Sequence, residues 1–138
     1  MNACTFEDVE TLARTLWGEA RGEGTAGMEA VASVILNRSR DKRWPDSIKD
    51  VCTQRYQFSA WNKNDPNRDK LLAVDLNSPS FRSAYAVAAR AIAGDIHDDS
   101  CGANHYMTDA LFNSSRRPSW ADENAITARI GNHVFMKL

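Results

Sequence analysis

The first stretch of the chain carries apolar residues at helical spacing. Its apolar positions lie three or four residues apart, at Val9, Leu12, Ala13, Leu16 and Ala20. This period predicts a helix from Thr5 to about Ala20, and Thr5 with Asp8 has the spacing of a capping box. Gly22 and Gly24 are expected to end this helix, because glycine favours the left-handed conformation that closes helix termini.

Two further apolar stripes predict helices later in the chain. The first comprises Met28, Val31, Val34 and Ile35. It predicts a helix that Thr25 caps and that runs to about Arg40, so that the first two helices form a hairpin with a Gly-rich elbow. Another strong helix is expected after Ser78-Pro79, an N-cap with a first-turn proline, and it ends at Gly94.

The rest of the chain has weaker periodicity. A short helix is expected at 47–52 and a polar loop at 53–69, while 103–107 reads as extended. Residues 127–136 predict two short strands about Gly131-Asn132. The expected fold class is therefore mainly α (α+β), with a small C-terminal β element. Its 138 residues suit one catalytic domain, 1–138.

Composition narrows the classes of partner. Seventeen Lys and Arg residues against eighteen Asp and Glu give a net charge of -1, which offers no general attraction for nucleic acid or anionic membrane. The start of the chain has no basic and apolar leader, and no apolar run is long enough to span a membrane. We therefore expect cytoplasmic synthesis without a signal peptide and no stable membrane insertion.

The cysteines fit a reducing compartment. Cys4, Cys52 and Cys101 are odd in number and widely spaced, as expected of buried or incidental thiols. A bridge between Cys4 and Cys52 after export stays open as an alternative, because connectivity cannot be deduced from spacing.

One carboxylate stands out in the opening hairpin. At about 100° per residue, Glu19 falls at the edge of the apolar stripe of the first helix, whereas Glu29 falls opposite the stripe of its own helix. A carboxyl group beside apolar side chains resists ionisation and can donate a proton near neutral pH. Glu19 is therefore a general-acid candidate. The alternative is a helix-end glutamate paired with Arg14 or Arg21.

The polar loop contains aromatic residues among amides and hydroxyls. The run Tyr56-Gln57-Phe58-Ser59-Ala60-Trp61 is followed by Asn62 and Asn64. Flat aromatic faces beside polar groups suit a sugar ring, which offers C–H faces and hydroxyls, so a polysaccharide is a reasonable substrate. The alternative is that Phe58 and Trp61 cap the core beneath a long loop.

Metal and cofactor chemistry have little support. His97, Cys101 and His105 are four residues apart, but this spacing converges only on a helix, and Gly94 and Gly102 bracket the segment as loop. The chain has no phosphate loop, dinucleotide fingerprint, Gly-x-Ser-x-Gly elbow or His-Glu-x-x-His. We expect no metal and no cofactor.

Several segments together resemble one family. The run from Leu12 to Glu23, Leu-Ala-Arg-Thr-Leu-Trp-Gly-Glu-Ala-Arg-Gly-Glu, is followed by Gly27 and by Ala-Val-Ala-Ser-Val-Ile-Leu-Asn-Arg ending at Arg38. Further matching segments are Gln57-Phe58-Ser59-Ala60-Trp61, Gly102-Ala-Asn-His-Tyr106, Pro118-Ser-Trp120 and Ile130-Gly-Asn-His-Val-Phe135. The chain resembles the cell-wall hydrolases related to spore cortex-lytic enzymes.

The resemblance implies a lysozyme-like helical fold that cleaves the glycan strand of peptidoglycan by lytic transglycosylation. By motif position the catalytic acid and base is Glu19, the residue that helical geometry also selects. The resemblance, with the aromatic loop, places a set of residues along the glycan: Gln57, Phe58, Ser59, Trp61 and Tyr106, with His105 and Trp120 as weaker members. A monomeric phage endolysin that acts on the wall after release reconciles the absent leader with an external substrate. A hydrolytic muramidase and a catalytically silent glycan-binding module remain alternatives.

Overall fold

The computed structural model describes residues 5–54 and 57–138. Its α-helices are α1 (Phe6–Ala20), α2 (Gly24–Ser39), α3 (Ile48–Thr53), α4 (Asn67–Ala73), α5 (Pro79–Ile92) and α6 (Asp109–Phe112). Short 3-10 helices are η1 (Arg21–Glu23), η2 (Ser59–Trp61) and η3 (Glu123–Ala125), and the strands are β1 (His105–Thr108), β2 (Ile126–Ile130) and β3 (His133–Met136). The expected mainly helical fold with a C-terminal β element is confirmed.

The first helix forms as its sequence predicts, while the elbow after it differs. Thr5 caps α1 with both hydrogen bonds of the capping box to Asp8 in place. The second helix begins two residues earlier than expected, with Glu23 and not Thr25 at its N-cap. The reason is the intervening turn η1, after which Gly24 adopts a φ of 74° and lets the chain reverse.

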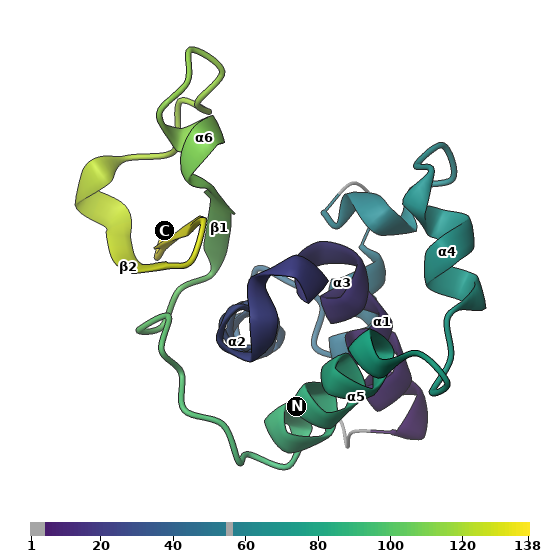
Figure 1. Cartoon of the computed structure of the whole chain (residues 1–138). Coiled ribbons are helices and arrows are strands. Elements are labelled where there is room, and N and C mark those ends of the chain that lie inside the picture. The colour runs from purple at the N-terminus through teal and green to yellow at the C-terminus, as the bar shows by residue number, and fades with distance from the viewer. Residues whose placement is uncertain (1–4, 55–56) are drawn as a thin grey trace.

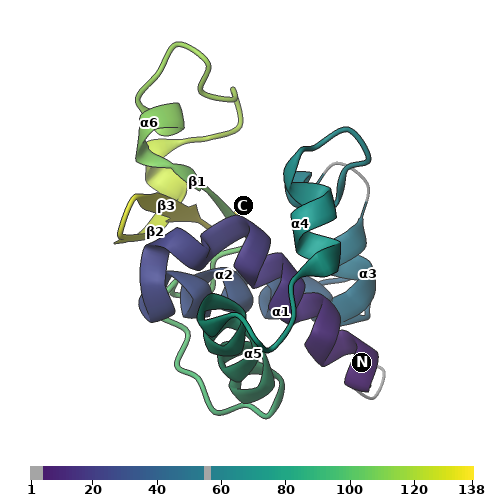
Figure 2. The same cartoon turned by 45° about the vertical axis from the view of Figure 1, so that its right-hand side comes forward.

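Helix α2 is the centre of the molecule. Val31 and Ile35 pack in the main core with α1 and α5, whereas Ala30 and Val34 pack against the sheet residue Phe135. Figure 2 shows α2 between the sheet on one side and α5 on the other. Because it is covered on two sides, α2 is buried almost all round and its sequence is apolar beyond a single stripe.

The later helices differ in how clearly the sequence predicts them. Ser47 caps α3 and Ser78 caps α5, as expected. Helix α4 was not predicted, because Leu71 is its one fully buried residue and no apolar stripe repeats along it. The expected loop 53–69 therefore contains η2, and its last three residues are the first turn of α4.

The C-terminal strands form an antiparallel sheet in the order β1-β3-β2. Tyr106 of β1 lies opposite Phe135 of β3, and Ile130 of β2 lies opposite His133. The predicted turn at Gly131-Asn132 is confirmed, with Gly131 at a φ of 56°. The sheet and α6 lie on one side of α1 and α2, and α4 lies on the opposite side (Figure 1).

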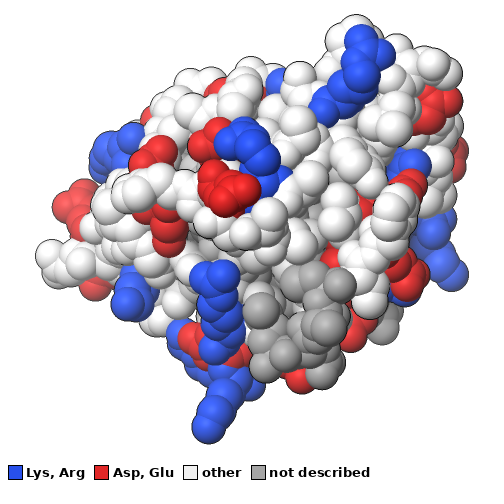
Figure 3. Space-filling model, turned by 90° about the horizontal axis from the view of Figure 1, so that it is seen from below, with Lys and Arg blue, Asp and Glu red and all other residues white. Residues whose placement is uncertain are grey.

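Charged side chains of both signs lie on the surface (Figure 3), and Cys52 and Cys101 are free thiols. Lysine, arginine and acidic side chains are interspersed on the face shown in Figure 3, in keeping with a net charge of -1. Within the described ranges, every helix is too short or too polar to cross a bilayer. Cys52 is a buried free thiol whose pKa burial raises to about 12, and Cys101 is an exposed free thiol. The alternative bridge from Cys4 lies outside the described residues.

Candidate active site

Glu19 lies in the last turn of α1, at the helix end where backbone carbonyls concentrate negative charge. Its side chain is largely buried. Burial, the largest cause, and the Asp65 carboxylate together raise the pKa of the Glu19 carboxyl from its ordinary value of 4.5 to about 7, against a backbone hydrogen bond from Ser59 that lowers it. A carboxyl group with this pKa is present in both the acid and the base form near neutral pH.

The two arginines that were the alternative partners of Glu19 are engaged elsewhere. Arg14 donates to the Glu10 carboxylate and to the backbone carbonyls of Leu71 and Val74. Arg21 donates to the Trp17 carbonyl, and its guanidinium lies over the Trp17 ring at 4.0 Å from the centroid. The pKa of Glu19 therefore reflects burial and not a stabilising ion pair.

Asp65 is held in place beside Glu19 by the start of α4. Its Oδ1 accepts a hydrogen bond of 2.8 Å from the backbone N–H of Asn67, an Asx-turn that an asparagine would also form. The loop therefore fixes a negative charge within electrostatic reach of the Glu19 carboxyl.

Replacement of Asp65 by asparagine is expected to lower the pKa of Glu19 below about 7. The pKa should stay above 4.5, because burial, the larger cause, is unchanged. Carbon NMR titration of the Glu19 carboxyl measures the change. Asp75→Asn is the matched control, since Asp75 forms the same turn with Asn77. An Asp65→Asn titration that matches the wild-type curve would contradict the assignment.

Tyr106 connects Glu19 to the sheet. It projects from β1, stacks on Phe135 with ring centroids 5.8 Å apart, and meets His133 edge-on at 5.3 Å. Burial and the Glu19 charge raise the pKa of the Tyr106 hydroxyl, and the nearby Arg38 guanidinium opposes the rise. The hydroxyl therefore stays protonated and can donate a hydrogen bond in this site.

Arg38 is a buried guanidinium that joins α2 to two other segments. Its Nε donates to the Asn104 carbonyl at 2.7 Å, and its Nη1 donates to Gln57 Oε1 at 3.3 Å. The same guanidinium lies near the rings of Trp44 and Phe58. Burial lowers the pKa of Arg38, which nevertheless stays a cation at any physiological pH.

Arg38→Met is expected to destabilise the fold by about 2–3 kcal/mol, because the buried Asn104 carbonyl loses a charge-assisted hydrogen bond. Urea denaturation followed by circular dichroism measures the change in the free energy of unfolding. Arg116→Met, at an exposed position, is the control and should stay within about 0.5 kcal/mol of wild type. Equal midpoints for the two variants would show that the buried contacts contribute little.

Some residues of the aromatic loop pack in the core, and others are exposed to solvent. Phe58 is 2% exposed and lies in the main core, so the structure favours its packing alternative. Trp61 packs against that core, and its Nε1 donates to Thr15 Oγ1 at 2.9 Å. Gln57 and Ser59 are exposed on either side of Phe58. Tyr56 lies outside the described residues.

His105 and Trp120 come together away from Tyr106, on the other face of β1. Their ring centroids are 4.9 Å apart, and Trp44 lies on the far side of His105 at 5.8 Å. Trp44 was not among the site residues predicted from the sequence. Trp44 lies beside Pro45, after the end of α2, where the sequence has no hydrophobic periodicity that would have indicated its place in the fold.

Glu23 and His133 form a second polar pair that sequence reasoning missed. Glu23 Oε1 lies 3.5 Å from His133 Nδ1, and the two side chains are 18% and 8% exposed. Added Cβ atoms at Gly27 and Gly131 would lie 2.4 and 3.0 Å from Glu23 atoms, so the two glycines make room for it. Gly27, near the elbow, and Gly131, in the hairpin turn, were the features of the sequence from which this pair could have been predicted.

The histidine and thiol groups considered for metal binding do not converge on one point. His97 pairs with Asp99 at 2.8 Å in an exposed loop, while His105 bonds to Asn104. In residues 5–54 and 57–138, no three His, Cys, Asp or Glu side chains are placed to hold one metal ion. Glu29, on the side of α2 opposite the predicted apolar stripe, pairs with Arg90 at 3.0 Å.

The chain matches a known family over most of its length. A family model described as Cell Wall Hydrolase matches residues 22–136. A spore cortex-lytic enzyme of Halalkalibacterium halodurans is 30% identical over 130 residues, covering 93% of this chain and 34% of that protein. The corresponding enzyme of Bacillus subtilis is 42% identical over 86 residues, 56% of this chain and 28% of that protein. The chain thus spans about a third of the length of these relatives.

Solved structures show the same architecture. The catalytic domain of the Bacillus cereus SleB protein superposes with a TM-score of 0.75 at 26% identity, covering 99% of this chain and 94% of that one. The catalytic domain of the germination-specific lytic transglycosylase SleB from Bacillus anthracis gives 0.72 at 27% identity, with 99% of each chain covered. The lysozyme-like helical fold expected from the sequence is confirmed.

Proposed function

Because this chain belongs to the cell wall hydrolase family, we propose that it cleaves the bond between N-acetylmuramic acid and N-acetylglucosamine in peptidoglycan glycan strands. The proposed reaction is a lytic transglycosylation with Glu19 as the single acid and base. The observation that carries it is the largely buried Glu19 carboxyl with a pKa of about 7. The matched family segment begins after Glu19, so the role of this residue rests on its geometry and electrostatics.

The proposed chemistry uses the two protonation states of Glu19 in turn. The protonated carboxyl gives its proton to the glycosidic oxygen, and the bond to the muramoyl anomeric carbon breaks. Positive charge then develops on the muramoyl ring. The ionised Glu19 removes the proton from the 6-hydroxyl of that ring, whose oxygen attacks the anomeric carbon. The product is a 1,6-anhydromuramoyl end, and Glu19 is protonated again.

Other groups near Glu19 are proposed to support this sequence. The Ser59 backbone N–H stabilises the ionised carboxylate formed after proton transfer. The Tyr106 hydroxyl, kept neutral by burial, offers a donor to the sugar. Gln57 and Trp61 are proposed to contact the glycan from the loop before α4, with His105 and Trp120 at its other end. Phe58, which is buried, is proposed only to support this loop from the core.

A hydrolytic muramidase is the second candidate, and Asp65 is the observation that favours it. An inverting hydrolase needs a second carboxylate about 6.5–9.5 Å from the acid, to activate water. Asp65 is a carboxylate within electrostatic reach of Glu19. In the transglycosylase proposal its part is to hold the pKa of Glu19 high, and no water takes part.

Mass spectrometry of digested peptidoglycan distinguishes these candidates. Anhydromuramoyl ends throughout are expected for a transglycosylase, whereas reducing ends throughout would establish hydrolysis, in which Asp65 is the candidate base. A wild-type chain that binds glycan and releases no fragments would support the silent binding module. The phage lysis role and the monomeric state stay predictions. Lysis of a host cell on co-expression with a membrane-permeabilising protein, and sedimentation of the purified chain, test them.

A further inference from the structure

Three aromatic side chains from distant parts of the sequence form a row outside the Glu19 site. His105 is its middle member, with Trp44 edge-on at 5.8 Å and Trp120 tilted at 4.9 Å between ring centroids. Trp120 is 46% exposed although it is a large aromatic residue, and Trp44 and His105 are partly exposed. The row therefore presents an apolar surface with one polar ring at its centre.

The hydrogen bonds of Asn104 fix the tautomer of His105. The Asn104 side chain is clamped by the backbone of Leu138: its Nδ2 donates to the Leu138 carbonyl at 3.1 Å, and its Oδ1 accepts from the Leu138 N–H at 2.9 Å. This clamp leaves no freedom to flip the amide. His105 Nδ1 lies 2.7 Å from the same Oδ1, so Nδ1 carries the proton and donates. In the neutral ring, Nε2 is then a hydrogen-bond acceptor.

The surroundings keep this imidazole neutral. Partial burial, followed by the Arg38 and Arg43 guanidinium groups, lowers the pKa of His105 to about 4. Both guanidinium groups also lie over Trp44, at 5.3 and 4.7 Å from its ring centroid. A cationic ligand would be repelled by the two arginines, whereas a neutral or acidic ligand would not.

We infer that Trp44, His105 and Trp120 form a distinct sugar subsite that takes an N-acetylated hexosamine of the glycan strand. The exposed face of Trp120 covers the C–H face of the sugar, and His105 Nε2 accepts a hydrogen bond from a hydroxyl or from the acetamido N–H. This inference rests on the proposed function, because it names a second position on the same polymer. A pyranose ring with an acetamido group supplies both the apolar face and the donor that the row requires.

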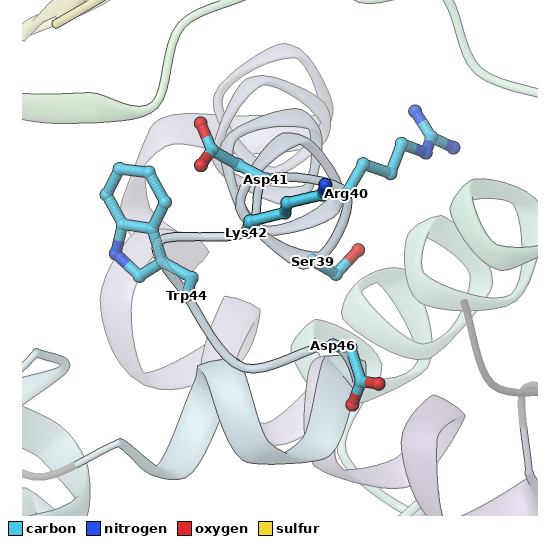
Figure 4. Close-up of a pocket in the computed structure, with 6 residues that line it drawn as sticks. All are labelled: Ser39, Arg40, Asp41, Lys42, Trp44 and Asp46. Atoms are coloured by element: carbon cyan, nitrogen blue, oxygen red, sulfur yellow. The ribbon is translucent and has the colours of Figure 1, made fainter.

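The surface beside the row leaves space for a longer chain. Trp44 also lines a cavity of about 640 Å³, together with Ser39, Arg40, Asp41, Lys42 and Asp46. Figure 4 shows the Trp44 indole on one side of this cavity and the Arg40 side chain on the opposite side. The size is within the range of about 300–1,000 Å³ that ligand pockets occupy. A strand that crosses the row can therefore continue past Trp44.

Binding to a chain that does not cleave its ligand tests the subsite. In a Glu19→Gln background, Trp120→Ala and His105→Phe are each expected to weaken binding of a peptidoglycan tetrasaccharide about tenfold by calorimetry, through the lost ring face or the lost acceptor. His105→Phe keeps an aromatic ring in the row, a somewhat larger one, and removes both ring nitrogen atoms. Phe6→Ala, at an exposed phenylalanine on α1, is the control and should bind as tightly as the background.

The pH dependence of binding tests the acceptor role separately. With His105 neutral, affinity of the Glu19→Gln chain should be constant between about pH 5.5 and 8. Affinity that falls as the pH rises through about 6.5 would mean that a cationic imidazole donates, and would overturn the assignment. Unchanged binding by both Trp120→Ala and His105→Phe would overturn the subsite.

The proposed function fails in a different way. If the wild-type chain releases no muropeptides, or if Glu19→Gln cleaves as fast as wild type, the proposed function is wrong whatever the row binds. If wild type cleaves while Trp120→Ala and His105→Phe keep its KM and kcat, the function stands and the subsite does not. A rise in KM at unchanged kcat for these two variants supports both.

Discussion

Glu19→Gln is expected to lower the rate of peptidoglycan cleavage by about 10²–10⁴-fold, the contribution typical of a positioned acid and base. Glutamine keeps the size of the side chain and can still accept the Ser59 hydrogen bond, but it has no proton to transfer. Release of soluble muropeptides from purified cell wall, followed by chromatography, measures the loss. An effect below tenfold would remove Glu19 from the chemistry.

The stability of the variant separates lost chemistry from lost folding. The pKa of Glu19 is raised in the folded chain, so its protonated form stabilises the fold at low pH, and this contribution is lost as the pH rises through about 7. Glutamine stays neutral, so Glu19→Gln should unfold no more easily than wild type at pH 8 and is expected to be more stable there. Glu7→Gln, an exposed position on the same helix, is the matched control and should retain full activity.

The pH profile of kcat/KM is the second large expected effect. Because the first step requires protonated Glu19, activity should fall above a midpoint near pH 7 and be about a hundredfold lower at pH 9 than on the plateau. A soluble glycan fragment is the appropriate substrate, since the charge of intact wall also changes with pH. Constant activity from pH 6 to 9 would contradict the raised pKa of Glu19.

The shape of the profile also separates the two mechanisms. If one residue is both acid and base and must be protonated at the start, kcat/KM falls only on the alkaline side of the profile. A hydrolase with a second, ionised carboxylate adds an acid limb. Asp65→Asn should move the alkaline limb to lower pH in a transglycosylase, in parallel with the NMR titration, and should abolish turnover in a hydrolase that uses Asp65 as its base.

The stronger helices and the position of Glu19 beside the apolar stripe could be predicted from the sequence because their signals are local. Thr5 and Ser78 satisfy backbone N–H groups within one turn, and the stripe of α1 is buried on one side only, which fixes where Glu19 lies relative to the core. Helix α4 and the N-cap at Glu23 were not predicted. Helix α4 buries too little surface to show an apolar stripe, and the position of the N-cap depends on how Gly24 turns the chain.

The sequence by itself determined the mainly helical fold, the hairpin at its centre and Glu19 as the unusual carboxyl, since periodicity, caps and burial on one helix are properties of neighbouring residues. Only the tertiary structure decided which groups surround that carboxyl. Asp65 and Tyr106 are 46 and 87 residues further along the chain than Glu19. The fold of α4 and β1 against the hairpin brings both within electrostatic reach of Glu19: the Asp65 charge raises the pKa of Glu19, and the Glu19 charge raises the pKa of Tyr106. Electrostatic interactions depend on distance in space and not in sequence.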